Sequence, residues 1–271
     1  MVAMLLLNLL FFLFHIVLAR PSPLPDNDNI IAFNRAECQR PTQDPLQGCP
    51  RNTLLVGPDG RFKTIQAAIL SIPNNTVPYY VLIQPGNYTE QVNVTQQNPI
   101  TLLGVTNSPN TNAGNTVTII WHNATGTATT GTYDNAYTST LTVAPDFNSS
   151  ATGSGPDGNP VPPGTPFGSY NFRVYNLDIE NDYLPYSAGP SLAISISYAN
   201  AGFYYSSLRS YQDTVYIGKL GNTYFYQGEI AGQTDFMYGF GTLWVQSSRI
   251  ALRSCGGGTF YYIAEISLKI P

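Results

Sequence analysis

Two stretches of the chain align without a gap, FYYSSLRSYQDTVY at residues 203–216 and FYQGEIAGQTDFMY at residues 225–238. Each begins with an aromatic residue, has an apolar residue five positions later and an aspartate ten positions later, and the two copies are 22 residues apart. Neither copy shows the spacing of apolar residues that an amphipathic helix requires. A non-helical segment that recurs at such a period is typical of successive coils in a repeat fold.

The same pattern extends over the second half of the chain, where apolar residues five positions apart recur four times. First members of successive pairs are 29, 22 and 20 residues apart, with small or polar residues inside each pair. This spacing predicts the rungs of a parallel β-helix, in which each coil buries its apolar face against the next coil. A β-sandwich would also have many short strands, but the hairpin turns that it needs, such as Asp59-Gly60 and Asp157-Gly158, lie outside the repeats. The pairs are Val174 and Ile179, Phe203 and Leu208, Phe225 and Ile230, and Val245 and Ile250.

Composition supports an all-β protein and excludes several functional classes. Of 271 residues, 10% are charged and 13% aromatic, with 24 Gly, 21 Pro and a net charge of −4. Without a basic surplus the chain is not expected to bind nucleic acid, and its aromatic content argues against disorder. Strands are predicted at 53–56, 79–83 and 100–103, with one amphipathic helix at 64–73 that Pro73 ends. Residues 147–169 are predicted to form a Gly/Pro/Ser-rich surface loop within one domain.

The N-terminal region predicts secretion. Residues 2–19 carry no charge and are predicted to be a signal peptide that is cleaved after Ala19. The alternative is an uncleaved membrane anchor, because about 18 apolar residues are just enough to span a bilayer. Cys38 and Cys49, with ten residues between them in a loop-like segment at 20–52, are expected to form a disulfide, which leaves Cys255 without a partner. We also expect N-glycosylation at some of five sequons: Asn74, Asn87, Asn93, Asn123 and Asn148.

The rare residues exclude most metal and nucleophile chemistry. The two histidines are His15, in the apolar N-terminal run, and His122, beside a sequon, so a Ser-His-Asp site is not expected. Three cysteines without a usable histidine cannot build a tetrahedral zinc site, and no EF-hand loop occurs. A metal site built from oxygen ligands stays open, and the groups that remain for chemistry are carboxylates, amides, hydroxyls and a few arginines.

Asp213 and Asp235 are the candidate site. If 22 residues make one coil, these aspartates occupy equivalent places on neighbouring coils, about 4.8 Å apart. Two carboxylates that close raise one pKa, which leaves one acid and one anion. The alternative is that both are solvated turn residues. Four flanking aromatic residues favour a sugar-binding groove: Tyr211, Tyr216, Phe236 and Tyr238.

Several blocks in order resemble the fungal pectin methylesterases. They are GNYTE at 86–90, YQDTVY at 211–216 and DFMYG at 235–239, preceded by Cys38-Gln39, Gly48-Cys49-Pro50 and FKTIQAA at 62–68. The resemblance implies a right-handed, single-stranded parallel β-helix of the pectin lyase type. It also implies an activity, the hydrolysis of methyl esters of homogalacturonan, that needs neither metal nor cofactor. It also implies roles for three residues, with Asp235 as nucleophile, Asp213 as general acid and then base, and Gln212 as oxyanion-hole donor.

Two departures from the family pattern bear on activity. Pro190 stands where the family has a second oxyanion glutamine, and proline has no donor. The Leu-Gly-Arg-Pro-Trp block of the family is also missing, and Arg253 is a poor positional substitute for its arginine. Residues 259–271 match nothing in the family. We therefore expect a β-helix at 53–258 that is incomplete at its C-terminal end.

Three hypotheses follow. The first is a secreted, extracellular and monomeric pectinesterase whose partner is pectin, with no membrane attachment after signal cleavage. The second is a non-catalytic pectin-binding cell-wall protein, which Pro190 and the missing arginine favour. The third is a retaining glycoside hydrolase, because carboxylates about 5 Å apart also suit that mechanism.

Overall fold

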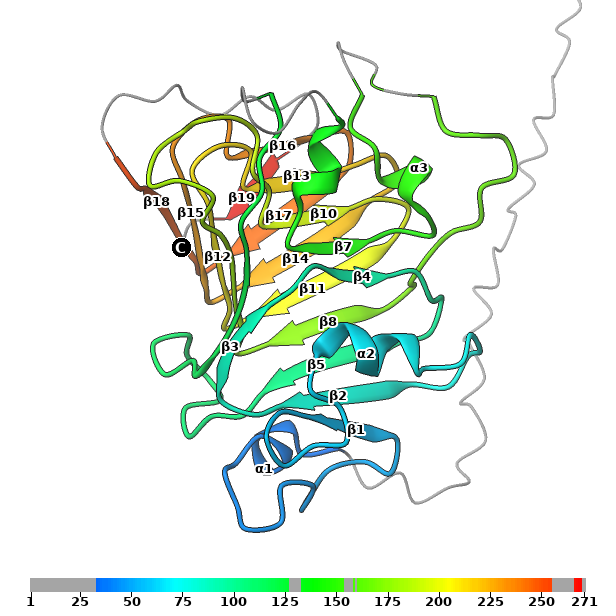
Figure 1. The fold of residues 1–271 in the computed structure, drawn as a ribbon, viewed down its shortest axis with the longest axis vertical. Helices are drawn as coiled ribbons and strands as arrows, with labels where there is room; N and C mark the ends of the chain where they lie inside the picture. The colour runs from blue at the N-terminus through cyan, green and yellow to red at the C-terminus, as the bar shows by residue number, and fades with distance from the viewer. Residues whose placement is uncertain (1–32, 127–132, 154–157, 159, 255–265, 270–271) are drawn as a thin grey trace, which may run out of the picture. The chain divides into compact units, whose positions relative to one another are not determined.

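The chain winds into coils that stack in three parallel sheets, in a computed structural model that describes residues 33–126, 133–153, 158, 160–254 and the backbone of 266–269. It divides into two units, 1–33 and 34–271, and all helices and strands belong to the second. Each complete coil contributes one strand to sheet A, one to sheet B and one to sheet C (Figure 1). The fold is the parallel β-helix that the repeats predict.

The strands follow the coils in order through the three sheets. Sheet A contains β1 (Thr53–Val56), β2 (Tyr79–Ile83), β5 (Ile100–Gly104), β8 (Phe172–Tyr175), β11 (Asn200–Tyr204), β14 (Asn222–Tyr226), β17 (Thr242–Gln246) and β19 (Ile266–Lys269). Sheet B contains β3 (Gly86–Thr89), β6 (Val117–Trp121), β9 (Asp178–Asn181), β12 (Ser207–Arg209), β15 (Glu229–Gly232) and β18 (Arg249–Leu252). Sheet C contains β4 (Val92–Val94), β7 (Leu141–Val143), β10 (Ile194–Ile196), β13 (Val215–Ile217) and β16 (Met237–Gly239).

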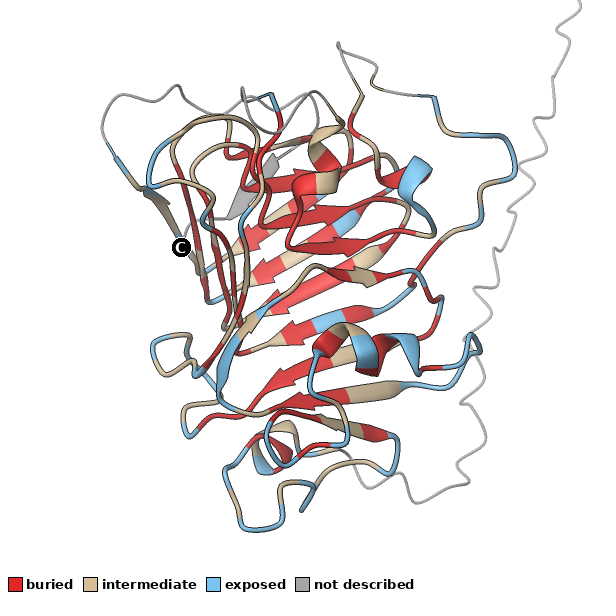
Figure 2. Ribbon diagram, in the orientation of Figure 1, coloured by how far each residue is buried: buried red, intermediate tan, exposed pale blue. Residues whose placement is uncertain are grey.

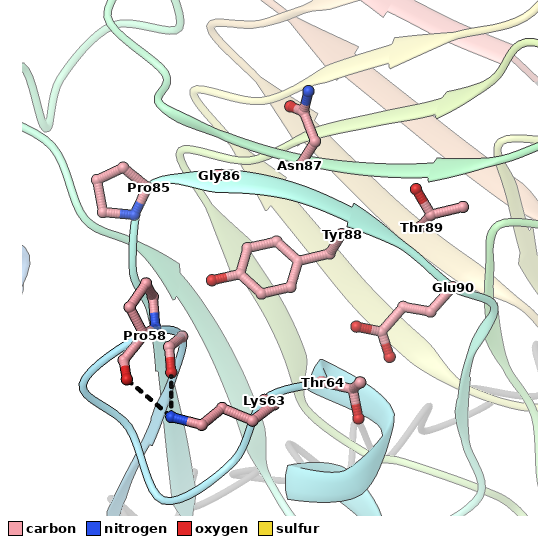
Figure 3. A pocket seen from close by; sticks show the side chains of 10 residues that line it. Pro58, Lys63, Thr64, Pro85, Gly86, Asn87, Tyr88, Thr89 and Glu90 are labelled. Carbon is pink, nitrogen blue, oxygen red and sulfur yellow. Dashed lines mark hydrogen bonds between the residues drawn. The ribbon is translucent and has the colours of Figure 1, made fainter.

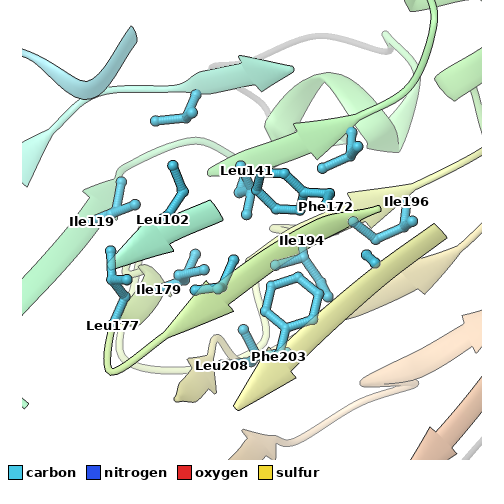
Figure 4. Close-up of a cluster of buried hydrophobic side chains, with 14 of the residues drawn as sticks. Leu102, Ile119, Leu141, Phe172, Leu177, Ile179, Ile194, Ile196, Phe203 and Leu208 are labelled. Carbon is cyan, nitrogen blue, oxygen red and sulfur yellow. The ribbon is translucent and has the colours of Figure 1, made fainter. Parts of the chain in front are cut away.

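The predicted apolar pairs stack in register. Their first members pair across sheet A in the order Val174, Phe203, Phe225 and Val245. Their second members pair across sheet B in the order Ile179, Leu208, Ile230 and Ile250. All but Ile250 are buried, and they form one continuous core with the apolar residues of sheet C (Figures 2 and 4). Each interval between successive pairs is therefore confirmed as one coil, including the 22-residue interval that separates Asp213 from Asp235.

Helix α2 (Ile65–Leu70) covers the first coil and confirms the one helix that the sequence predicts. Its Ile65, Ala68 and Ile69 are buried, and it contacts β1, β2 and β4. The backbone amides of Ile65 and Gln66 each donate to the Glu90 carboxylate at 2.8 Å, which satisfies two of the free donors at the helix N-terminus. Glu90 thus connects the GNYTE block to the start of the helix.

The segment before β1 and the long loops contain short elements that the sequence analysis did not predict. They are α1 (Arg35–Cys38), η1 (Asn135–Thr138) and α3 (Phe147–Ser150), each of four residues. The Cys38–Cys49 disulfide is present, as predicted. The proposed signal peptide, Cys255 and the side chains of the 259–271 tail lie outside the described residues. Among the helices of the described part, none is long and apolar enough to cross a membrane.

In the later coils, from β8 onward, several corners between sheets carry a non-glycine residue with left-handed backbone geometry. At the corner between sheets A and B these residues have φ of 49° to 56°. At the corner between B and C they are Asp213 (φ 61°) and Asp235 (φ 45°), and between C and A they are Tyr198 and Leu220, both at 50°. Such angles are uncommon outside glycine, and Asn and Asp tolerate them best. The A–B corner residues are Asn176, Tyr205, Gln227 and Ser247.

Replacing Phe225 by alanine tests the stacked core. Phe225 is fully buried and its ring centroid lies 6.4 Å from that of Phe203 on the preceding coil. We expect F225A to lower the free energy of unfolding by about 3–5 kcal/mol, measured by urea denaturation. The matched control is F147A, whose side chain is 56% exposed in α3 and is expected to change stability by less than about 1 kcal/mol. Equal losses for both variants would contradict the stacking account.

Candidate active site

Asp213 and Asp235 occupy the same place on adjacent coils. Gln212 forms a parallel bridge with Thr234, Val215 pairs with Met237, and the Asp213 amide donates to the Thr234 carbonyl at 3.0 Å. The register offset is 22 residues on both sides of the aspartates, so Asp213 lies opposite Asp235 at the corner between sheets B and C. With the usual strand spacing of about 4.8 Å, the two carboxylates are neighbours, as the sequence predicts.

The environments of the two carboxylates differ. Asp213 is only 6% exposed, whereas Asp235 is partly exposed. The pKa of Asp213 is raised to about 7, first by burial and also by the charge of Asp235, while the nearby donor groups of Tyr238 and Asn135 act in the opposite direction. Asp213 can therefore hold a proton up to near neutral pH, which is the property that a general acid requires.

Asn135 is a site residue that the sequence analysis missed. Its Nδ2 donates to Oδ2 of Asp213 at 3.2 Å across 78 positions of the chain. Asn135 begins η1, and the preceding Asp134 fixes this segment by accepting from the amides of Ala136, Thr152 and Gly153 at 2.8–2.9 Å. No sequence pattern marks Asn135, because it lies in a long loop whose path depends on the Asp134 contacts.

The four aromatic residues predicted to flank a sugar-binding groove differ in how far they are exposed. Tyr216 and Phe236 are each 1% exposed; Phe236 belongs to the hydrophobic core and has no free face for a ligand. Tyr216 packs against Tyr238, with ring centroids 5.0 Å apart. The Tyr238 hydroxyl is buried near Asp213 and makes no hydrogen bond of regular geometry to any described residue. Tyr211 is partly exposed at the corner itself.

Gln212 and Pro190 lie next to each other on neighbouring coils. The backbone carbonyl of Gln212 accepts from the Ser191 amide at 3.0 Å, whereas its side-chain amide has no partner among the described residues and is free to donate. The Pro190 carbonyl accepts from the Thr125 amide at 3.0 Å, and its ring supplies no donor to the corner. One of the two side-chain donors expected from the family pattern is therefore available here.

Arg253 lies near the pair but is not its counter-ion. Its guanidinium carbon stacks 4.1 Å from the centroid of the Tyr211 ring, and its Nη1 donates to the Ser210 carbonyl at 3.2 Å. Among the ion pairs of the described residues, none includes Asp235. Those residues also contain no cluster of three His, Cys, Asp or Glu that could hold a metal ion.

A separate cavity of about 350 Å³ lies at the first coils and contains neither aspartate (Figure 3). Lys63 spans one side of it, where its Nζ donates to the carbonyls of Pro58 and Gly60 at 2.7 and 3.1 Å. These contacts close the turn at 57–63, and Glu90 on the other side of the cavity accepts from the helix amides of Ile65 and Gln66, so Glu90 of the GNYTE block has a structural role. The lining residues are Gly57, Pro58, Lys63, Thr64, Pro85, Gly86, Asn87, Tyr88, Thr89 and Glu90.

Known proteins with sequence similarity to this chain include fungal pectinesterases. No family model matches the chain. A probable pectinesterase A from Aspergillus flavus is 27% identical over 207 residues, which cover 76% of this chain and 54% of that protein. The chain is similar in sequence to the fungal pectinesterases. It spans about half the length of the curated relatives that it matches.

Solved pectinesterase structures share the fold. A pectin methylesterase from Aspergillus niger superposes with a TM-score of 0.60 at 24% identity, over 79% of this chain and 61% of that one. A pectin methylesterase variant in complex with a hexasaccharide gives a TM-score of 0.53 at 25% identity, over 73% of this chain and 54% of that one. The pectinesterase fold therefore covers most of the described coils.

The Asp213 environment predicts a pH-dependent gain in stability for D213N. The pKa of Asp213 is raised from 3.8 to about 7 in the folded protein. The contribution of the protonated Asp213 carboxyl to the free energy of unfolding is therefore complete below about pH 4 and is lost as the pH rises through 7. At pH 8 we expect D213N to be more stable than the parent by up to about 4 kcal/mol, and at pH 4 nearly equal, measured by urea denaturation. The exposed control D44N should show no such pH dependence; a D213N gain that is the same at both pH values would contradict the shift.

Proposed function

We propose that this chain is a pectinesterase that hydrolyses methyl esters of homogalacturonan to pectate and methanol. The observation that carries the proposal is the in-register pair of Asp213 and Asp235, one buried with a raised pKa and one partly exposed. Relationship to the pectinesterases and the hexasaccharide complex of a structural relative support this substrate class.

In the proposed mechanism the partly exposed Asp235 is the nucleophile. Its carboxylate attacks the ester carbonyl, and the free amide of Gln212 donates to the oxyanion that forms. Protonated Asp213 gives its proton to the methoxy oxygen, so methanol leaves and the galacturonyl group stays on Asp235 as an anhydride. Asp213, now ionised, takes a proton from water, and the resulting hydroxide attacks the anhydride carbonyl. The products are the free uronate and the original Asp235 carboxylate.

We further propose that the protein is secreted, monomeric and glycosylated. Of the five sequons, Asn74, Asn87 and Asn148 are exposed and best suited to carry a glycan. Asn123 is less suitable, because its side-chain oxygen accepts from the Tyr133 hydroxyl. The disulfide between Cys38 and Cys49 supports an oxidising compartment.

A second candidate is a pectin-binding protein without turnover. Three observations favour it: Asp213 is buried under Asn135, Pro190 supplies no oxyanion donor, and Asp235 has no cationic partner among the described residues. This candidate predicts pectin binding with no release of methanol. The glycoside hydrolase hypothesis predicts new reducing ends instead.

Methanol release from highly methylated pectin tests the esterase directly. We expect D235N to reduce the rate by at least about 10³-fold and Q212A by about 10²–10³-fold, because these changes remove the nucleophile and the oxyanion donor. D182N, an exposed aspartate paired with His122, is the matched control and should keep full activity. If the parent chain releases no methanol between pH 4 and 9 yet binds pectin, the binding-only candidate replaces this one.

The pH profile tests the role of Asp213 as the acid. Because Asp213 must enter the reaction protonated, we expect kcat/KM to fall as the pH rises above about 7. N135A removes a donor that favours the ionised carboxylate, so the pKa of Asp213 should rise and the falling limb should move to higher pH. N52A, whose amide donates to the Pro78 carbonyl elsewhere, is the control. A limb that N135A leaves in place or moves to lower pH would rule out this role for the contact.

A further inference from the structure

The outer face of sheet A carries in-register rows of polar and aromatic side chains that the proposed reaction does not use. One row contains Arg173, Gly202, Tyr224 and Trp244, on β8, β11, β14 and β17. A second row contains Tyr175, Tyr204 and Tyr226 on the first three of these strands. Each coil passes from sheet A to B to C, so this wall is separate from the B–C corner that holds Asp213 and Asp235.

A small notch opens in this face above Gly202. The notch has a volume of about 120 Å³ and is lined by Arg173, Tyr204 and the side chains of Asn171 and Asn200. It exists because Gly202 has no side chain, and a Cβ atom there would lie only 2.7–2.8 Å from the Tyr204 ring and hydroxyl. A space of this size is too small for a whole sugar, but it accommodates a carboxylate and one ring edge.

The charge of this face favours an anionic ligand. Strands β1 to β17 of sheet A contain no aspartate or glutamate, and Arg173 is their only charged residue. Arg173 is exposed, and its Nε donates to Oδ1 of Asn171 at 2.8 Å, which holds the guanidinium in place. Its two Nη atoms have no partner among the described residues, so they are free to donate to a ligand carboxylate as a fork.

The neighbouring groups are suited to sugar hydroxyls. Asn222 donates to Asn200 at 3.0 Å and Asn200 to the Tyr170 carbonyl at 3.2 Å, so these amides form an ordered row beside the notch. The Tyr204 ring stacks on Tyr175 with centroids 4.6 Å apart, which holds its hydroxyl near Arg173. Because strands are about 4.8 Å apart, a chain laid across them meets a new side chain at intervals comparable to one pyranose unit.

We propose that the Arg173–Gly202–Tyr204 notch is a second binding site, which holds a free uronate carboxylate of an acidic polysaccharide on the outer face of sheet A. The anionic class follows from the charge and geometry of the notch, and the identification of the polymer as de-esterified homogalacturonan rests on the proposed function. The site would keep the protein on the polymer that its own reaction produces.

Binding to polygalacturonate tests the site, in the full chain carrying D235N so that no turnover occurs. We expect R173Q in this background to weaken binding at low salt by about tenfold, because a charge-assisted contact is lost, and R173K to give an intermediate loss. R61Q is the matched control: it removes an exposed arginine at a distant loop, and its affinity should equal that of the background. Fully methyl-esterified pectin should bind R173Q and the background equally.

Two outcomes separate this site from the proposed function. If R173Q and the background bind polygalacturonate equally, the site is wrong even if the parent chain releases methanol. If the parent chain releases no methanol but R173Q still lowers polygalacturonate affinity, the esterase proposal fails and the second site stands. Thermal unfolding of R173Q should match that of the background. If R173Q instead unfolds at a lower temperature, its loss of affinity is attributed to the fold, and Y204F replaces it as the test. Y204F removes only a hydroxyl, and we expect it to weaken polygalacturonate binding by about threefold.

Discussion

Parallel pairing of successive coils is the constraint on which the rest of the structure depends. Hydrogen bonds between strands fix the spacing at about 4.8 Å, so a residue on one coil must lie beside its equivalent on the next. In the core this brings Phe203 against Phe225, and at the B–C corner it brings Asp213 against Asp235. The same ladder that buries apolar side chains therefore forces two carboxylates into proximity, and this proximity adds to the effect of burial in raising the pKa of Asp213.

The length of the later coils can be predicted from the sequence, and for this reason most of the fold could be predicted. The two members of each apolar pair are always five residues apart, each pair lies within one coil, and their register in the structure follows directly from their alignment. The disulfide and helix α2 also depend on local sequence and were predicted. The short elements α1, η1 and α3 were not, because each has only four residues, which is too short for the apolar periodicity of a helix to appear in the sequence.

The candidate site also combines features that the sequence predicts with features that it does not predict. Proximity of Asp213 and Asp235 follows from the repeat, whereas the burial of Asp213 follows from a loop that enters from a preceding coil. Asn135 reaches the carboxylate because Asp134 holds that loop by backbone amides, a contact with no periodic signature. The aromatic residues were predicted as a group, but whether a ring faces solvent or the core depends on its place in the coil: Tyr211 is partly exposed and Phe236 is internal.

At Asp213 and Asp235 the fold requires a left-handed backbone, whereas the proposed chemistry requires a carboxylate. Both positions need a residue that accepts a positive φ, and glycine and asparagine meet that need at least as well as aspartate. A single nucleotide change converts an aspartate codon into one for either residue. A lineage with this fold can therefore lose its acid pair in one mutational step while its coils stay folded, so descendants that bind without catalysis are readily accessible to evolution.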